Sequence, residues 1–125
     1  MLVDISIGEL VDKVSILKIK SCKIQDPKKL KNIHHELKLL SRKMESTGIT
    51  VESSGYRKLE KINTALWDIE DRIRMKEAKK AFDDEFIQLA RSVYLQNDER
   101  AAVKREINTA YGSNLIEEKS YASYT

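Results

Sequence analysis

Glycine and proline are scarce in this chain, and their scarcity limits its possible folds more than any other feature. Only four glycines and one proline occur among 125 residues, about 4% against a usual combined share of roughly 12%. Sandwiches and barrels need turn residues at every strand connection, so the composition argues against them. We expect a few long helices, in a chain long enough to bury one core.

Apolar side chains recur every three or four residues in four segments, which is the spacing of a helix with one buried face. These segments cover residues 6–25, 27–47, 54–80 and 83–111, whereas residues 113–125 show no periodicity. We therefore predict an all-α fold, an antiparallel bundle of four helices with an extended C-terminal tail. No segment has the composition of a linker between domains, so residues 1–125 are expected to form a single helical-bundle domain.

Capping residues support the starts of these helices. Ser6 precedes the first apolar repeat, and Glu9 three residues later completes the pattern of a capping box. Asp26 and Pro27 fit the N-cap and the first helical position of the second segment. Asp83 has the same capping role before the fourth segment.

The apolar stripes are narrow, and the last two segments are longer than the first two. A narrow stripe on a long helix leaves part of that helix without a partner inside one chain. We therefore expect the longer pair to pack against a second copy, which gives a homodimer.

The fourth segment has polar residues on the face that should be apolar. Asn97, Lys104 and Asn108 occupy positions where the other segments have Leu or Ile. A buried polar group must find a partner, so three interpretations remain open. This end of the helix faces water, or the polar residues form a seam that fixes the register of a dimer, or they line a ligand site.

The third segment carries a matching polar cluster on one helical face. A buried ammonium at Lys104 would need an anion, which Glu70 or Asp71 could supply until an anionic ligand replaces it. The predicted ligand-binding residues are Trp67, Glu70, Asp71, Arg74, Asn97, Arg100, Lys104 and Asn108.

No complete catalytic or metal-binding pattern accompanies these residues. The chain has no glycine-rich phosphate loop and no zinc-ligand spacing, and His34 and His35 point about 100° apart on a helix. We expect no metal and no cofactor, and leave open whether the chain is an enzyme.

The cysteine content and the absence of a leader indicate the compartment. Cys22 is the only cysteine, so no disulfide forms within the chain, and the N-terminus lacks the basic and apolar regions of a signal peptide. The longest uncharged stretch, residues 107–116, is about half of what a membrane-spanning helix needs. We expect a soluble, cytoplasmic protein that does not bind membranes.

Positive charge is concentrated in the first part of the chain. Residues 1–50 hold ten basic and six acidic side chains, and residues 51–125 hold thirteen and fourteen. No aromatic residues for base stacking interleave with this charge, so nucleic acid is not an expected partner. The basic run is Lys18, Lys20, Lys23, Lys28, Lys29 and Lys31.

Several strings in this order resemble a small family of uncharacterised helical domains found in bacteria and phages. The strings are Ser6–Lys13, Leu66–Asp71, Phe86–Tyr94, Asn97–Ala101 and Gly112–Tyr121. The resemblance covers nearly the whole chain and implies a single domain located in the cytoplasm. If the protein is phage-encoded, this would be the cytoplasm of the host. It carries over no activity and no site residue.

Two functions remain after these exclusions. The first is a non-catalytic interaction or assembly module that forms homodimers. The alternative is a small α-helical enzyme or ligand-binding protein that acts on an anionic small molecule, either phosphorylated or carboxylated.

Overall fold

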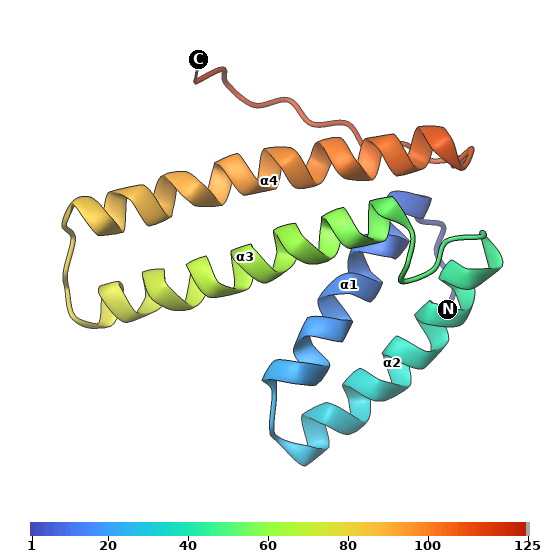
Figure 1. Cartoon of the computed structure of the whole chain (residues 1–125), viewed down its shortest axis with the longest axis horizontal. Helices are drawn as coiled ribbons and strands as arrows, with labels where there is room; N and C mark the ends of the chain where they lie inside the picture. Colours follow the sequence, from blue (N-terminus) through green and yellow to red (C-terminus); the bar gives the residue numbers. More distant parts are fainter. Residues whose placement is uncertain (125) are drawn as a thin grey trace.

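The computed structural model describes residues 1–124, and it contains four helices and no strand within that range. The helices are α1 (Ile7–Lys23), α2 (Pro27–Ser46), α3 (Ser54–Ala78) and α4 (Asp84–Ala110) (Figure 1). Each begins and ends within two residues of its predicted boundary, so the all-α bundle of four helices is confirmed.

The predicted caps are confirmed at three helix starts, with one difference. The side chains of Asp26 and Asp83 accept hydrogen bonds from backbone N–H groups in the first turns of α2 and α4. Ser6 Oγ accepts from the Glu9 N–H at 3.1 Å, which is half of the expected capping box. The Glu9 carboxylate does not complete the box, because it binds the ammonium of Lys104 instead.

The bundle consists of two antiparallel hairpins that cross at a steep angle (Figure 1). Helices α3 and α4 form the longer hairpin, and α1 and α2 form the shorter one. Among the described residues, α1 is the helix that packs against all three others. The crossing leaves the connected ends of α3 and α4 extending beyond α1.

The apolar core lies where α1 crosses the longer hairpin. Its buried members include Val11 and Val14 of α1, Leu59 of α3 and Ile107 of α4. In α2 the predicted stripe is only partly confirmed, since Leu37 is half-buried at the edge of this cluster.

A glycine allows the close crossing of α1 and α4. A Cβ atom built on Gly8 would lie 2.5 Å from the carbonyl oxygen of Lys104, closer than real Cβ contacts come. Backbone cannot move aside as a flexible side chain can, so any larger residue here would push the two helices apart. Gly8 therefore fixes the distance between the helices that carry the polar groups described below.

The C-terminal tail returns along α4 without regular secondary structure (Figure 1). Glu118 Oε1 accepts a hydrogen bond from Arg105 at 2.7 Å, and the Tyr124 hydroxyl donates to Asp98 Oδ2 at 2.6 Å. The irregular tail is confirmed for residues 113–124; the last residue of the predicted range, Thr125, lies outside the described residues.

Within the described chain, no helix is both long and apolar enough to cross a membrane.

Candidate functional site

Polar side chains are buried where α1, α3 and α4 meet. They need partners within the protein, because an unpaired buried polar group costs stability. The buried polar and charged residues are Ser6, Asp12, Ser15, Asn63, Lys104 and Asn108.

The side chain of Asn108 caps the start of α1 and does not line a cavity. Its Oδ1 accepts a hydrogen bond from the Gly8 N–H at 2.6 Å, and the nearby Ser113 Oγ accepts from the Ile7 N–H at 3.0 Å. The first N–H groups of a helix have no intrahelical partner, so these two side chains satisfy them. Asn108 is 2% exposed and lines neither of the cavities described below, so the structure gives no support to its predicted place in a ligand site.

Lys104 is the most buried charged group of α4. Its Nζ lies 2.6 Å from Glu9 Oε2, 3.1 Å from Glu117 Oε2 and 3.9 Å from Asp12 Oδ2. The partners come from α1 and the tail, so the prediction that Glu70 or Asp71 of α3 would be the partner is wrong. The interpretation in which this end of α4 faces water is also wrong for Lys104 and Asn108, which are 8% and 2% exposed.

The electrostatics of this cluster favour the charged forms of Lys104 and Glu117. Burial by itself lowers the pKa of Lys104, but the hydrogen bonds to Glu9 and Glu117 outweigh burial, so the pKa is raised above its ordinary value. Hydrogen bonds from Lys119 and then Lys104 lower the pKa of Glu117 to about 2. The tail is therefore held to α4 by a carboxylate that stays ionised well into acid.

A second chain of hydrogen bonds joins the three helices next to Lys104. Asn63 Nδ2 donates to Asp12 Oδ1 and to Ser15 Oγ, both at 2.8 Å. Asn63 Oδ1 accepts from Arg100 Nη1 at 3.3 Å. The buried carboxylate of Asp12 thus lies between the amide of Asn63 and the ammonium of Lys104.

Two cavities adjoin these networks, and they share Asn97 and Arg100. The first, called here the interhelical cleft, has a volume of about 540 Å³ and lies between α1, α3 and α4. It is lined by Ile16, Ile19, Asn63, Leu66, Trp67, Glu70, Asp71, Arg74, Asn97 and Arg100. The cleft therefore brings together six of the eight residues predicted for the site.

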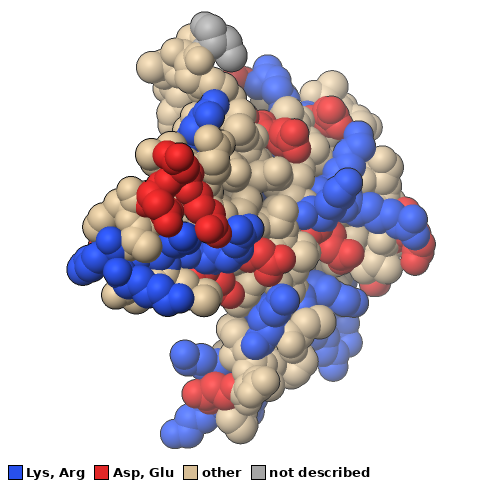
Figure 2. All heavy atoms as spheres, turned by 60° about the vertical axis from the view of Figure 1, so that its left-hand side comes forward, with Lys and Arg blue, Asp and Glu red and all other residues tan. Residues whose placement is uncertain are grey.

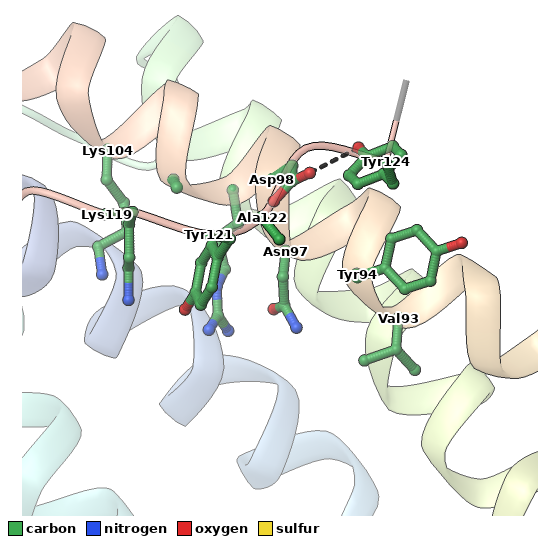
Figure 3. A pocket seen from close by; sticks show the side chains of 11 residues that line it. Val93, Tyr94, Asn97, Asp98, Lys104, Lys119, Tyr121, Ala122 and Tyr124 are labelled. Atoms are coloured by element: carbon green, nitrogen blue, oxygen red, sulfur yellow. Dashed lines mark hydrogen bonds between the residues drawn. The ribbon is translucent and has the colours of Figure 1, made fainter.

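The second cavity, called here the tail cavity, has a volume of about 610 Å³ and lies between α4 and the tail. In Figure 3 the side chains of Asn97, Lys104 and Lys119 extend toward the same side of α4. It is lined by Val93, Tyr94, Asn97, Asp98, Arg100, Ala101, Lys104, Lys119, Tyr121, Ala122 and Tyr124.

The two cavities differ in charge. The tail cavity is lined by three cations and one carboxylate, and that carboxylate, Asp98, is bonded to the Tyr124 hydroxyl. The interhelical cleft has equal numbers of each sign, two arginines against Glu70 and Asp71. Lys104 and Lys119 already bind Glu117. The only carboxylate that lines the tail cavity has a partner, whereas Asp71 of the cleft has none among residues 1–124, so an anion is better accommodated in the tail cavity.

Among the cations that line either cavity, Arg100 is the one without a carboxylate partner in residues 1–124, since Arg74, Lys104 and Lys119 each form an ion pair. Arg100 is half-buried, and its one hydrogen bond to the described residues is the 3.3 Å contact with Asn63. No carboxylate of residues 1–124 lies within 4.0 Å of its guanidinium. A guanidinium has five N–H donors, so most of those of Arg100 remain available to a ligand.

The contribution of the tail to the site could not be predicted from the sequence. Lys119, Tyr121 and Tyr124 supply much of the tail cavity, yet their segment has no periodicity that predicts where it packs. Glu9 was predicted as a capping-box residue, and its contact with Lys104 was not predicted. Among residues 1–124, no group of three or more His, Cys, Asp or Glu side chains is placed to hold a metal ion.

The chain belongs to a family described as a family of unknown function (DUF6165), which it matches over residues 1–125. No curated protein and no solved structure matches it.

The shifted pKa of Glu117 predicts a pH dependence of stability. Its pKa is about 2 in the folded protein against 4.5 as the ordinary value. Because the folded pKa is lower, the stabilisation is present above pH 4.5 and is lost as the pH falls toward about 2. Glu117→Gln should therefore lower the melting temperature at pH 6, and the difference from wild type should shrink between pH 4.5 and 2. A difference that stays constant over this range would contradict the assignment.

Proposed function

We propose that this protein binds a small anionic molecule in the tail cavity, with Arg100 as the main anion-binding group. The observation that carries the proposal is the half-buried guanidinium of Arg100, which lines the cavity with one hydrogen bond and no ion pair among the described residues. A half-buried cation with free donors can make strong, charge-assisted hydrogen bonds to a carboxylate or phosphate. The ligand class is therefore phosphorylated or carboxylated.

The size and lining of the tail cavity indicate what else the ligand carries. Its volume falls within the roughly 300–1,000 Å³ that is usual for small-molecule sites. Tyr94 and Tyr124 lie with their ring centroids 5.0 Å apart beside the cationic part, and Tyr121 adds a third ring. Aromatic faces bind flat rings well, so we propose an anionic group attached to a ring.

Glu117 competes with such a ligand for part of the site. Its carboxylate binds both Lys104 and Lys119, at 3.1 and 2.8 Å. An anionic ligand can bind Arg100 without displacing it, or can replace it at the two lysines. Glu117 would therefore be the internal anion that a ligand replaces, the role predicted from the sequence for Glu70 or Asp71.

Thermal-shift measurements with phenyl phosphate, benzoate, inorganic phosphate and phenol test this function. A ligand that binds only the folded state raises the melting temperature. We expect phenyl phosphate or benzoate to raise it more than phosphate or phenol at equal millimolar concentration. Arg100→Gln should abolish the shift.

The matched control is Arg91→Gln. Arg91 is an exposed residue of the same helix that lines neither cavity and pairs with no carboxylate of residues 1–124. It should keep the full shift. An equal shift in the Arg100 and Arg91 variants, or no shift with any of the four compounds, would refute the proposed site.

A second candidate function, assembly through a homodimer, is favoured by the surface of the α3–α4 hairpin. Met75, Phe82 and Ile87 lie near the connected end of that hairpin and are each at least half exposed. Large exposed apolar side chains that lie close together are typical of interaction sites. The long helices thus have apolar surface available for a second copy.

Light scattering tests this candidate. We expect a mass near twice 14.4 kDa at micromolar concentration, and a shift to the single-chain mass in the double variant Phe82→Ser with Ile87→Glu. Val51→Glu, at an exposed apolar residue of the α2–α3 connection, is the control that should remain dimeric. A wild-type mass of 14.4 kDa would count against assembly.

A cytoplasmic location, in a bacterium or in the host of a phage, is part of the proposal. Its support is the exposed, unpaired thiol of Cys22, which fits a reducing compartment.

A further inference from the structure

The α1–α2 hairpin concentrates the positive charge of the molecule. Residues 13–46 hold ten basic and three acidic side chains, a net charge of +7. The rest of the chain holds thirteen basic and seventeen acidic side chains, a net charge of −4. Figure 2 shows the lower, projecting end of the molecule, where most of the charged side chains are Lys or Arg.

The outer face of α2 arranges part of this charge in a single row. Lys28, Lys31, His35, Lys38 and Arg42 follow one another at intervals of three and four residues, so they lie on one face of the helix. All five are exposed, and they lie opposite the apolar side chains that face α1. At 1.5 Å per residue the row is about 21 Å long.

The cations of this hairpin are unpaired. None of the ten basic side chains of residues 13–46 has a carboxylate of residues 1–124 within 4.0 Å. By contrast, Lys58, Arg72, Lys76 and Arg105 on α3 and α4 each have such a partner. Like charges in a row repel one another, and an external polyanion would relieve that repulsion.

We propose that the outer face of α2 binds the phosphate backbone of double-stranded DNA without reading its sequence. An α-helix is about 10–12 Å across, and the major groove of B-DNA is about 12 Å wide. A convex helix with four permanent cations along one face can therefore lie in the groove or along its edge and neutralise several phosphates. The row contains no Asn or Gln to pair with adenine, which favours backbone contacts over base recognition.

Other polyanions fit this face less well. The bases of single-stranded nucleic acid need aromatic side chains for stacking, and none interrupts the row. A membrane-surface helix buries an apolar face in the lipid, whereas the apolar face of α2 is covered by α1. Leu39 is the one large apolar side chain of α2 that is mostly exposed. Duplex DNA requires neither feature, so the expectation that nucleic acid is not a partner, which rested on the lack of base-stacking residues, does not extend to the duplex.

Fluorescence anisotropy with a 20-base-pair labelled duplex tests the proposal. We expect a Kd of about 1–100 μM at 50 mM salt, independent of sequence. The slope of log K against log salt should be about −3 to −4, which corresponds to about four phosphates neutralised by the four permanent cations of the row. The triple variant Lys31→Gln, Lys38→Gln, Arg42→Gln should bind at least about tenfold more weakly, with a slope near −1.

The matched control removes the same charge elsewhere. Lys61, Lys79 and Arg91 are exposed, lie outside the hairpin and have no carboxylate partner among residues 1–124, so their triple change to Gln should weaken binding less than about threefold. Circular dichroism confirms that both variants are folded.

Three results would overturn the proposal. One is equal weakening in both triple variants, which would mean a response to net charge alone. Another is tighter binding to a single strand or to vesicles containing an anionic lipid than to the duplex. The third is no binding to the duplex at 50 mM salt.

Discussion

Lys104 carries a positive charge into the region where α1 crosses α4, and much of the molecule is arranged around that charge. An ammonium that is 8% exposed must be compensated, and carboxylates from two different parts of the chain provide the compensation. Glu9 ties the start of α1 to α4, and Glu117 ties the tail to the same helix. Gly8 makes these contacts possible, because it lets the two backbones approach closely.

The tail cavity follows from this arrangement. Since Glu117 holds the tail against α4, the residues after it bring Lys119 and two tyrosines opposite Arg100. The proposed ligand site is therefore built from residues far apart in the sequence, and it depends on an ion pair that is itself part of the fold. The basic face of α2 is independent of this network, so the two proposals stand or fall separately.

The helices could be predicted from the sequence, because apolar spacing and capping residues act locally. Ser6, Asp26 and Asp83 each accept hydrogen bonds within their own first turn, so sequence position alone identifies them. The sequence also indicated that the polar face of α4 needs partners. It could not say which, because the contact of Lys104 with Glu9 joins residues 95 positions apart and depends on how the hairpins cross. Asn108 shows the same limit: its role as a cap for α1 requires that crossing to be known.

The free energy of unfolding of Lys104→Met, measured by denaturant titration, tests most directly whether the fold depends on this charge. We expect a loss of about 2–4 kcal/mol, because Asp12 and Glu9 would remain near each other without their cation. The loss is smaller than for a fully enclosed pair, since the side chain of Glu9 is 32% exposed. Arg105→Met, which removes a neighbouring cation with an exposed partner, should change stability by no more than about 0.5 kcal/mol. A Lys104 variant as stable as the Arg105 variant would contradict the account.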